Sequence, residues 1–554
     1  MPYVVTRSCC ADASCVLACP VNCIHPAPGE PGFATAEMLY VDPLTCVDCG
    51  ACATACPVDA LKPHTALSGA ELPFLELNAT YYKDNPHADR TPMYVVPRRR
   101  ALPAGELSVA VVGAGPAGLF AADELLRHPG VRVTVYDRLP TPYGLARAGV
   151  APDHQDTKQV TQLFRTIESQ PGFSYRLGVE VGTHLTHADL LREHHAVLYA
   201  VGAATDKRLG IEGEDLRGSV SATDFVAWYN GHPDHAHDDH VLDTERAVVI
   251  GNGNVALDVA RILTADPEAL ARTDISDRAL AALRDSRIRE VVLLGRRGPA
   301  QAAFTLPELL ALAAIEDVDV RVEGWPDGLD PAATEKTRLL ARLAARTPVE
   351  GRRRIVLRFL TSPVRLTGDT SVRGLEITAT ALHTDEDGTV RARPTGETRA
   401  LETGLVLRSV GYRARPVPGL PFDEDSATVP HEGGRVEPGV YVAGWIKRGP
   451  TGFIGTNKTC AHETVESLLD DFAAGRLTRP IRDGGSAGDG LSGSGSGSGG
   501  SGVGTTTDTL DVDAWHAIDR AERAAGEAQG RPRVKFTDAE SLYRAAQATP
   551  AARG

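Results

Sequence analysis

The sequence predicts an α/β protein with two Rossmann-like, doubly wound dinucleotide-binding domains preceded by a small α+β domain rich in cysteine. Three observations predict this fold class. Nine of the ten cysteines lie between Cys9 and Cys56, an apolar stretch at 107–112 runs into a glycine turn, and the same pattern recurs at 246–251. An apolar strand followed by a glycine turn and a helix opens a doubly wound parallel sheet. At 554 residues the chain has room for roughly three or four such units.

Composition and charge narrow the class of protein further. Hydrophobic residues make up 42% of the chain and charged residues 23%, as in ordinary globular proteins. No run approaches the ~18 consecutive apolar residues of a membrane-spanning helix, and the first residues hold no signal-peptide core. We therefore expect a cytoplasmic protein without a membrane span. The formal net charge of −14 argues against nucleic acid as a partner.

The cysteine-rich region, residues 1–66, contains an internal duplication. The segment CVLACPVNCIHP at 15–26 is repeated as CATACPVDALKP at 52–63. Such a dense and local set of cysteines indicates metal binding in a reducing compartment, because it cannot form a disulfide framework for the whole chain.

Extended backwards, the repeat pairs Cys9 with Cys46 and Asp12 with Cys49. The second copy is then a complete C-x2-C-x2-C-x3-C-P run, whereas the first copy has an aspartate at its second ligand position. This run has the spacing of bacterial two-cluster ferredoxins, in which the fourth cysteine of each run ligates the other cluster. The region is therefore predicted to be an α+β bacterial two-cluster ferredoxin domain.

Crosswise ligation assigns the seven repeated cysteines to two clusters. A complete [4Fe-4S] cluster receives Cys19, Cys46, Cys49 and Cys52. The other cluster receives Cys9, Cys15 and Cys56, and is predicted to be [3Fe-4S], or a labile second [4Fe-4S] whose fourth iron is bound by Asp12 or solvent. Zinc would favour tetrahedral C-x2-C pairs instead. Cys10 and Cys23 have no partner in the repeat and are predicted not to be ligands, although Cys10 is a weak substitute for Cys9.

The first glycine turn contains Gly113, Gly115 and Gly118, after residues 67–106, which are rich in proline and arginine and are predicted to form a linker. Glycines here allow the backbone to approach a pyrophosphate at the positive end of the following helix. The next strand ends at Asp137, whose carboxylate would bind a ribose 2′-OH and repel a 2′-phosphate. The turn therefore predicts FAD or NAD rather than NADP.

The second glycine turn contains Gly251 and Gly253, with Ala256 in the third position. Its following strand ends in Arg296 and Arg297, and guanidinium groups bind phosphate through charge-assisted hydrogen bonds. An insertion at roughly 264–287 lengthens the crossover between the turn and these arginines. This second turn predicts NADP, although a solvated arginine pair is the alternative.

Two further regions carry weaker signals. His232, His235, His237 and His240 alternate with aspartate, and we expect a solvated loop there rather than a metal site. Residues 481–504 form a predicted Gly/Ser linker, followed by a short helical tail at 505–554. In the tail Trp515 and Ile518 lie at helical spacing, and Thr537 with Glu540 forms a possible capping box.

Four motifs resemble those of a known protein family. The segments GVAPDH (149–154), GNGNVALD (251–258), GRRGPAQAAFT (295–305) and GWIKRGPTGFIGTNK (444–458) resemble adrenodoxin-reductase-type ferredoxin:NADP reductases. With the cluster domain in front, the chain resembles the fused ferredoxin/ferredoxin:NADP reductases. The resemblance implies an FAD-binding domain in two parts, 107–208 and 405–480, with an NADP-binding domain at 209–404 inserted between them.

The resemblance also implies site residues. FAD contacts fall on Ala117, Asp137, Leu145, Val181, Trp445, Gly452, Phe453 and Ile454. NADP contacts fall on Asn252, Gly253, Asn254, Val255, Arg296, Arg297, Glu308 and again Gly452. Asp137 departs from the family's usual glutamate, which shortens the ribose contact but keeps its charge. His154 and Glu308 are candidate catalytic residues that tune the flavin–nicotinamide site, with a loop histidine and a helix-surface acid as the alternative reading.

The function implied is NADPH-dependent ferredoxin reduction. A hydride passes from NADPH to FAD, and single electrons then pass to the iron–sulfur clusters and to an external acceptor or donor protein of ferredoxin or cytochrome P450 type. A second hypothesis is an iron–sulfur flavoprotein subunit of a larger synthase, similar to the small subunit of glutamate synthase. A third, from a different class, is a redox sensor without turnover. A disulfide reductase is disfavoured because no C-x2-C or C-x4-C pair follows the first glycine turn.

Overall fold

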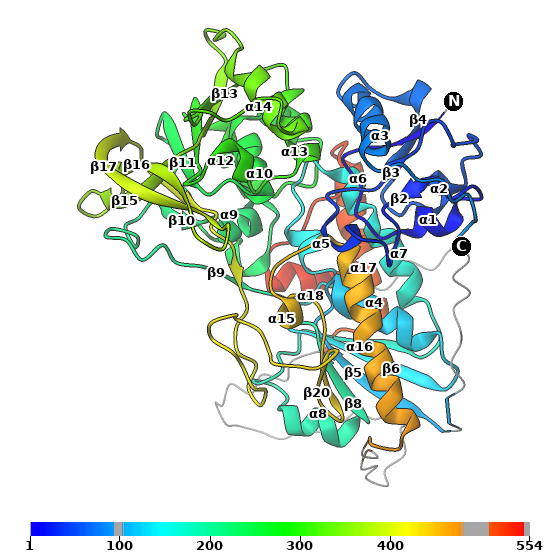
Figure 1. Cartoon of the computed structure of the whole chain (residues 1–554). Helices are drawn as coiled ribbons and strands as arrows, with labels where there is room; N and C mark the ends of the chain where they lie inside the picture. The colour runs from blue at the N-terminus through cyan, green and yellow to red at the C-terminus, as the bar shows by residue number, and fades with distance from the viewer. Residues whose placement is uncertain (1, 94–101, 104, 478–479, 481–508, 548–554) are drawn as a thin grey trace, which may run out of the picture.

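The computed structural model describes residues 2–93, 102–103, 105–477, 480 and 509–547 (Figure 1). The cysteine-rich region forms a small module at the upper right of Figure 1, which we call the cysteine module (residues 2–93). Two larger bodies are each built on a six-stranded sheet. The second of these is the green lobe at the upper left of the figure.

The cysteine module repeats its backbone as well as its sequence. Its first copy contains β1 (Tyr3–Val5), α1 (Ser14–Ala18) and β2 (Ile24–His25), and the second contains β3 (Tyr40–Val41), α2 (Ala51–Ala55) and β4 (Leu61–Pro63). Strand β1 pairs with β4 and β2 pairs with β3, both antiparallel, so each two-stranded sheet combines the two copies. Left-handed residues recur at equivalent positions: Ala11 and Asp48 have φ of 55° and 57°, and Asn22 and Asp59 have φ of 46° and 49°.

The predicted linker requires a correction, because part of it is a helix that belongs to the module. Helix α3 (Leu72–Asp84) buries Phe74 and Asn78 against β1 and β3. The Asn78 side-chain oxygen accepts hydrogen bonds from the backbone nitrogens of both strands, at 3.2 and 2.8 Å. Only these two residues of the helix are buried. The helix therefore lacks the broad apolar face by which the sequence would have revealed it.

The first large sheet has the strand order β20-β21-β8-β5-β6-β7. All pairs are parallel except β20 with β21. Helix α16 (Thr456–Ala473) packs along α4 (Pro116–Leu126) over this sheet (Figure 1). The strands are β5 (Leu107–Val112), β6 (Val131–Asp137), β7 (Phe173–Leu177), β8 (Ala196–Tyr199), β20 (Arg435–Glu437) and β21 (Val440–Val442). Shorter helices complete this body: α5 (Leu145–Ala148), α6 (Gln155–Lys158), α7 (Val160–Glu168), α8 (His187–Glu193) and α15 (Trp445–Arg448).

The second large sheet is parallel throughout, in the order β10-β18-β11-β12-β14-β13. Its strands are β10 (Ser219–Ser221), β11 (Arg246–Ile250), β12 (Glu290–Leu294), β13 (Val318–Glu323), β14 (Arg353–Arg358) and β18 (Leu405–Arg408). Its helices include α9 (Ala222–Tyr229), α10 (Asn254–Thr264), α13 (Leu306–Ala313) and α14 (Glu335–Ala344). The expected insertion folds as α11 (Pro267–Leu270) and α12 (Asp277–Arg284). A three-stranded antiparallel sheet adds β15 (Thr361–Thr367), β16 (Gly374–Thr384) and β17 (Val390–Glu402).

The boundary predicted between residues 404 and 405 also needs correction. Strand β18 pairs with β10 and β11 in the second sheet, and its Leu405 and Leu407 lie in the core of that body. The chain rejoins the first sheet only at β20. The two connections between the bodies run side by side as β9 (Thr205–Asp206) and β19 (Tyr412–Arg413), which pair antiparallel. The apolar run at 405–407 is buried in the second core rather than the first.

The tail is an integral part of the fold. Helix α17 (Val512–Glu527) buries Trp515 and Ile518 completely, and the Trp515 Nε1 donates to the Tyr143 hydroxyl at 3.3 Å. Helix α18 (Ala539–Gln547) starts one residue later than the expected capping box requires. Asp538 caps it instead by accepting from the Ser541 nitrogen at 2.7 Å. The predicted Gly/Ser linker lies outside the described residues.

The tail contacts both large bodies. Its Glu522 forms a two-pronged ion pair with Arg147 of the first body, at 2.9 and 2.6 Å. Its Lys535 pairs with Asp274 of the second body at 2.9 Å and donates to the Asn230 carbonyl. In Figure 1 the red helices accordingly lie between the two bodies. Within the described part of the chain, no helix is long and apolar enough to cross a membrane.

Candidate functional site

The first glycine turn joins β5 to α4, and backbone atoms pack tightly against its first and third glycines. A Cβ on Gly113, whose φ is 109°, would lie 2.5 Å from the Ala200 carbonyl oxygen. A Cβ on Gly118 would lie 2.0 Å from the Gly113 oxygen. Gly115, by contrast, has no atom within 4 Å of its Cβ position. The turn is therefore packed tightly against the protein and open at its middle glycine, where a pyrophosphate can approach the start of α4.

Asp137 ends β6 and is fixed beside this turn. Its Oδ2 accepts from the Ala114 nitrogen at 2.8 Å and its Oδ1 from the Leu139 nitrogen at 2.9 Å. Burial raises the pKa of Asp137, and these two hydrogen bonds oppose that shift by favouring the ionised form. A carboxylate held in this position fits the recognition of a ribose hydroxyl.

The glycine-rich segment at 444–458, which we call the late segment, lies against the same turn. Gly444 has φ of 76°, and a Cβ there would lie 2.6 Å from the Ala117 Cβ, so α15 begins directly on the glycine turn. The Trp445 Nε1 donates to the Thr451 carbonyl at 3.1 Å, which folds the segment back on itself. Arg448 donates to Asn457 at 3.0 Å, while its buried Nε and Nη1 have no protein partner. Arg448 was not anticipated from the sequence, and its unpaired N–H groups fit an anionic ligand.

The other expected FAD contacts border the same region. Leu145 follows Gly144, whose Cβ position is 3.1 Å from the Gly115 Cα. Val181 and Trp445 pack against one shared apolar core. Leu145 and Trp445 thus directly follow glycines that contact the first turn, and Val181 shares an apolar core with Trp445. Gly452, Phe453 and Ile454 continue the late segment towards the cysteine module.

The second glycine turn repeats the design between β11 and α10. A Cβ on Gly251, with φ of 122°, would lie 2.0 Å from the Ser409 oxygen, whereas Gly253 again faces open space. Ala256 is fully buried in the third position. The Asn252 backbone oxygen accepts a hydrogen bond from the Phe304 nitrogen at 2.9 Å. The Asn254 side-chain oxygen accepts one from the Thr305 nitrogen at 2.8 Å.

Arg296 and Arg297 follow β12 and are available to a ligand. Arg296 is exposed and Arg297 half-buried. Neither guanidinium group makes an ion pair or hydrogen bond within the described residues. By contrast, Arg246 on the neighbouring strand is paired with Glu290 at 2.5 Å. Two adjacent unpaired cations after this strand are free to bind a 2′-phosphate, and the solvated alternative has the same geometry.

Arg261 connects the two bodies at a junction that the sequence did not reveal. It is 6% exposed and donates to Asp153 at 2.5 Å, to Asp258 at 2.8 Å and to the His154 Nε2 at 2.6 Å. A guanidinium has only donors, so the His154 Nε2 must accept and the ring must be neutral, with its proton on Nδ1. Burial and then the Arg261 charge hold the pKa of His154 well below its ordinary value, in agreement with this assignment.

Glu308 completes the junction but is incompletely paired. Its Oε2 lies 4.0 Å from the Arg261 Nη1, and both atoms are buried without a hydrogen-bond partner. Burial raises the pKa of Asp258 to about 7, and the nearby charges of Glu308 and Asp153 add to the shift. The structure therefore brings together the expected pair, His154 and Glu308. This polar junction can hold a proton and orient a polar ring between the two bodies.

The seven repeated cysteines lie close enough for their charges to act on one another. Burial raises the pKa of Cys15 well above its usual value, and the charges of Cys9, Asp12, Cys56 and Cys52 add to the shift. Burial likewise raises the pKa of Cys52 to about 12, with contributions from Cys46, Cys19 and Cys49. Because Cys52 acts on Cys15 as well, these charges do not divide the cysteines between two clusters. Thiolates this close would repel one another without metal ions to compensate their charge, so the donor set fits iron–sulfur clusters.

The two unrepeated cysteines have different surroundings. Cys10 is buried in the core cluster of the first large body, and burial raises its pKa well above the usual value, with the charges of Asp12, Cys9 and Cys56 adding to the shift. The Cys23 Sγ lies 3.4 Å from the Cys19 Sγ, so this free thiol borders the four-cysteine group.

The Asp12 side of the module faces the first body. The Gly455 nitrogen donates to the Cys10 carbonyl at 2.8 Å, and a Cβ on Gly455 would lie 2.4 Å from the backbone at Ala11. Lys458 pairs with the Asp12 carboxylate at 3.5 Å and donates to Ser14 at 3.2 Å. Cys49 of the other group is exposed. The glycine-rich segment that lies on the first turn thus continues directly into the contact with the cysteine module.

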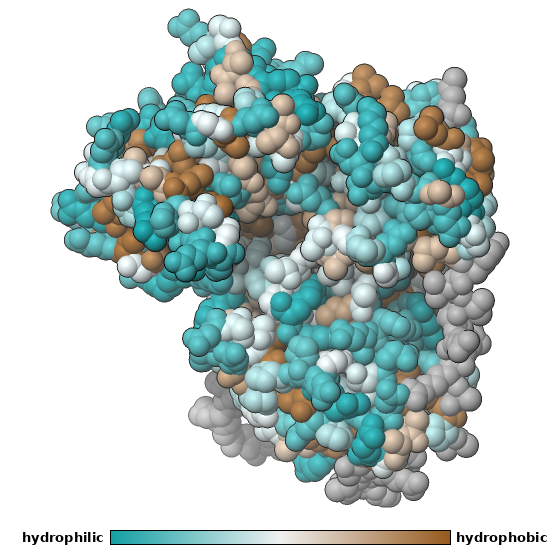
Figure 2. Space-filling model, viewed as in Figure 1, coloured by the Kyte–Doolittle hydropathy of each residue, from teal (hydrophilic) through white to brown (hydrophobic). Residues whose placement is uncertain are grey.

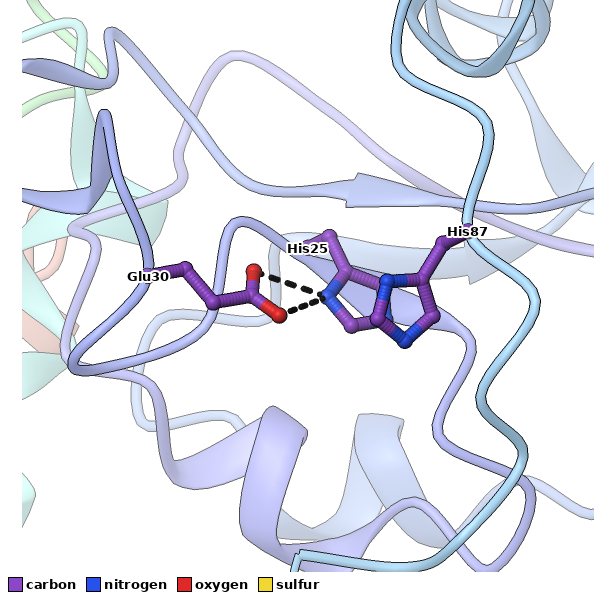
Figure 3. A group of neighbouring side chains, drawn as sticks. All are labelled: His25, Glu30 and His87. Carbon is purple, nitrogen blue, oxygen red and sulfur yellow. Dashed lines mark hydrogen bonds and ion pairs between the residues drawn. The ribbon is translucent and has the colours of Figure 1, made fainter.

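A second group of possible metal ligands in the module is structural. Figure 3 shows His25, Glu30 and His87, with the His25 Nδ1 3.0 Å from both Glu30 carboxylate oxygens. The His25 Nε2 faces the Asn22 carbonyl at 3.0 Å, and the imidazole rings of His25 and His87 are tilted by 35° with centroids 3.7 Å apart. Both His25 nitrogens are thus occupied by hydrogen bonds within the protein.

The histidine-rich loop likewise lacks a shared ligand centre. Among the described residues, no group of three convergent donors includes His232, His235, His237 or His240. The local contacts are instead ordinary hydrogen bonds, such as that between His235 and Asp238 at 2.9 Å.

Comparisons with known proteins agree with this geometry. Residues 107–293 match the pyridine nucleotide-disulphide oxidoreductase family, and residues 39–62 match the 4Fe-4S binding domain family. A probable ferredoxin/ferredoxin–NADP reductase of Mycobacterium tuberculosis is 50% identical, with 99% of this chain and 96% of that protein covered. The mitochondrial NADPH:adrenodoxin oxidoreductase of Arabidopsis thaliana is 38% identical, with 79% of this chain and 95% of that protein covered. The structure of Mycobacterium tuberculosis FprA in complex with NADPH aligns with a TM-score of 0.72 and 41% identity, covering 80% of this chain and 99% of that one.

Proposed function

Because the chain belongs to the ferredoxin/ferredoxin–NADP reductase family, we propose that it passes electrons from NADPH through FAD and two clusters of its own to an external acceptor protein. The chain is an NADPH-dependent oxidoreductase with a fused 4Fe-4S domain. The observation that carries the finer proposal is the contact of Gly455 and Lys458 with the Cys10–Asp12 segment. That contact joins the segment lying on the first glycine turn to one cysteine group.

The chain's own residues have distinct roles in the first site. Gly113, Gly115 and Gly118 shape the turn for the FAD pyrophosphate, and Asp137 binds the ribose. The late segment, with Trp445 and the half-paired Arg448, would hold FAD from the opposite side of the turn. When bound, FAD accepts a hydride from NADPH and releases electrons singly to iron–sulfur clusters.

The second site selects and orients NADPH. Arg296 and Arg297 bind the 2′-phosphate through charge-assisted hydrogen bonds. At the junction Arg261 keeps His154 neutral with its proton on Nδ1, while Asp258 and Glu308 supply negative charge near the nicotinamide. That charge favours the cationic ring that hydride loss produces, because electrostatic stabilisation acts where charge develops.

We assign the inner cluster to Cys9, Cys15 and Cys56, next to the first body, and the outer cluster to Cys19, Cys46, Cys49 and Cys52. The Asp12 carboxylate is engaged by Lys458 and by the Ser14 hydroxyl, which draws it towards the reductase. This favours a [3Fe-4S] inner cluster over one in which Asp12 binds a fourth iron.

The test of the electron route is steady turnover with two acceptors. The whole chain should reduce ferricyanide and cytochrome c with NADPH, and a variant that begins at Leu107 should keep its FAD and its ferricyanide activity. Cytochrome c reduction should fall in that variant. A whole chain that binds all its cofactors but gives no steady cytochrome c reduction would instead support the sensor hypothesis.

The inner cluster is tested separately by EPR of the protein purified in air. The wild type should show the signal of an oxidised [3Fe-4S] cluster, and Asp12→Cys should convert that site towards a stable [4Fe-4S] cluster. Two identical four-iron clusters in the wild type would refute the assignment of Asp12.

A further inference from the structure

The loop that carries Cys46 and Cys49 presents apolar side chains to solvent. We call residues 43–50 the outer ligand loop. Leu44 is 95% exposed and Val47 is 58% exposed, and both precede the exposed Cys49 in the same loop. Four of the eight large hydrophobic side chains exposed in the described residues belong to the cysteine module. Figure 2 shows apolar surface at the outer edge of this module, at the upper right. Exposed apolar residues grouped around one site indicate an interaction surface.

Charge on this face is negative. The cysteine module (residues 2–93) contains ten acidic residues and four basic ones, Arg7, Lys62, Lys83 and Arg90. Lys62 is paired with Glu71 at 2.7 Å, and Arg90 is paired with Asp42 at 3.5 Å. Asp48 in the outer ligand loop is exposed, and its carboxylate makes no ion pair in the described part of the chain.

The outer ligand loop lies away from the contacts that the module and the tail make with the two large bodies. The Cys10–Asp12 segment is covered by Gly455 and Lys458, so the inner cysteine group faces the first body. The tail packs between the two large bodies and pairs with Arg147 and Asp274. The exposure of Leu44 shows that no described segment covers the outer ligand loop. An electron that enters at the inner group therefore has its exposed exit at Cys49.

We propose that the outer ligand loop, through Leu44, Val47 and Asp48, docks a one-electron acceptor protein whose own cofactor edge is ringed by lysine and arginine. This inference rests on the proposed electron route. An apolar centre beside unpaired negative charge has the anatomy of a transient protein interface, with the charge steering encounter and the apolar residues supplying contact. A basic acceptor would bring its cofactor to the exposed ligand.

The test uses ferric cytochrome c, a basic haem protein, as the probe, and measures its binding to the oxidised whole protein by calorimetry without NADPH. Leu44→Lys with Val47→Lys should weaken binding at least ~10-fold, because like charge and lost apolar contact act together. The matched control, Val241→Lys with Val349→Lys, adds the same charge at exposed valines of the second body and should change binding less than ~2-fold. Raising salt from roughly 50 to 200 mM should weaken wild-type binding.

Kinetic measurements separate this inference from the proposed function. In the loop variant the KM for cytochrome c should rise, while ferricyanide reduction and the cluster EPR spectrum should stay as in the wild type. If those spectra change, Leu44→Ser with Val47→Ser removes the apolar contact without added charge and should still weaken binding several-fold. Wild-type affinity in both loop variants would overturn the docking surface. Failure of NADPH to reduce the clusters would overturn the electron route instead, and the binding measurement would still decide the surface.

Discussion

The two glycine turns of this chain share one backbone design and differ at the end of the strand that comes next. In each, the first glycine is pressed against a carbonyl oxygen, that of Ala200 for Gly113 and that of Ser409 for Gly251. The middle glycine of each turn faces open space. The strand after the first turn ends in a carboxylate, and the strand after the second is followed by two arginines. In our proposal the turn shapes a phosphate site, whereas the residues after the next strand select the nucleotide.

The largest expected effect removes that selection at the second turn. Arg296→Ala with Arg297→Ala should cost NADPH about 3–6 kcal/mol of binding if the two act independently, since charge-assisted hydrogen bonds contribute ~1.5–3 kcal/mol each. Coupled neighbours seldom add fully. The preference for NADPH over NADH, measured as kcat/KM for ferricyanide reduction, should therefore fall at least ~100-fold. An unchanged NADPH/NADH ratio would show that the two arginines are solvated and do not bind the 2′-phosphate.

The corresponding change at the first turn is Asp137→Asn. It removes the charge and one acceptor from a carboxylate that now receives the Ala114 and Leu139 nitrogens. FAD affinity should weaken by about 1.5–3 kcal/mol, or roughly 10- to 150-fold, as judged by titration of the apoprotein. Asp123→Asn, the same change on the outer side of α4, serves as the control and should retain FAD. Equal affinity in both variants would contradict the ribose contact.

The third residue differs between the turns, Gly118 in the first and Ala256 in the second, so each can be exchanged for the other's residue type. Gly118→Ala places a Cβ 2.0 Å from backbone oxygen and should destabilise the first body by about 1–3 kcal/mol, with loss of flavin. Ala256→Gly only loosens a helix and should cost roughly 0.5–1 kcal/mol. Thermal unfolding and flavin content report both changes. A Gly118→Ala protein as stable as the wild type would show that the first turn is less constrained than its geometry indicates.

The smallest expected effect lies at the junction between the sites. Burial raises the pKa of Asp258 from 3.8 to about 7, so the kcat/KM for NADPH should rise several-fold as pH increases through about 7 and the carboxylate ionises. Asp258→Asn should remove this limb of the pH profile. His154→Gln should leave it in place, because the pKa of His154 is held well below its usual range. If the rise in kcat/KM near pH 7 disappeared in His154→Gln but persisted in Asp258→Asn, the titrating group would be His154 and not Asp258.

The same ionisation affects stability with a defined sign. A folded-state pKa above the unfolded value means that folding favours the protonated carboxyl. The contribution of Asp258 is therefore fully present below pH 3.8 and is lost as pH rises through about 7. Chemical denaturation at several pH values should show a smaller decline over this range for Asp258→Asn than for the wild type.

The parts of the fold that could be predicted are those encoded within short stretches of sequence. Spacing alone identifies the duplicated cysteines and both glycine turns, because the backbone at each is constrained by the next few residues. The expected His154 and Glu308 do meet at the junction. Their meeting was implied by family resemblance rather than by pattern, since they lie on different bodies.

The rest depends on contacts between distant residues. Arg261 joins Asp153 to Asp258 across the two bodies, and no local signal distinguishes it from a surface arginine on a helix. Strand β18 is apolar and would suit either sheet, so only its pairing with β11 assigns it to the second. In the tail, the spacing of Trp515 and Ile518 predicted a helix. It could not predict that Lys535 would reach Asp274.

The most direct test of the electron route is rapid anaerobic mixing of the whole protein with NADPH, with flavin absorbance and freeze-quenched EPR recorded on the same time base. We expect flavin bleaching to precede loss of the oxidised inner-cluster signal, and both events to be much slower with NADH at the same concentration. Clusters that become reduced while the flavin stays oxidised, or an inner cluster that stays oxidised beside fully reduced flavin, would contradict the path from the first glycine turn through Gly455 to the Cys10–Asp12 segment.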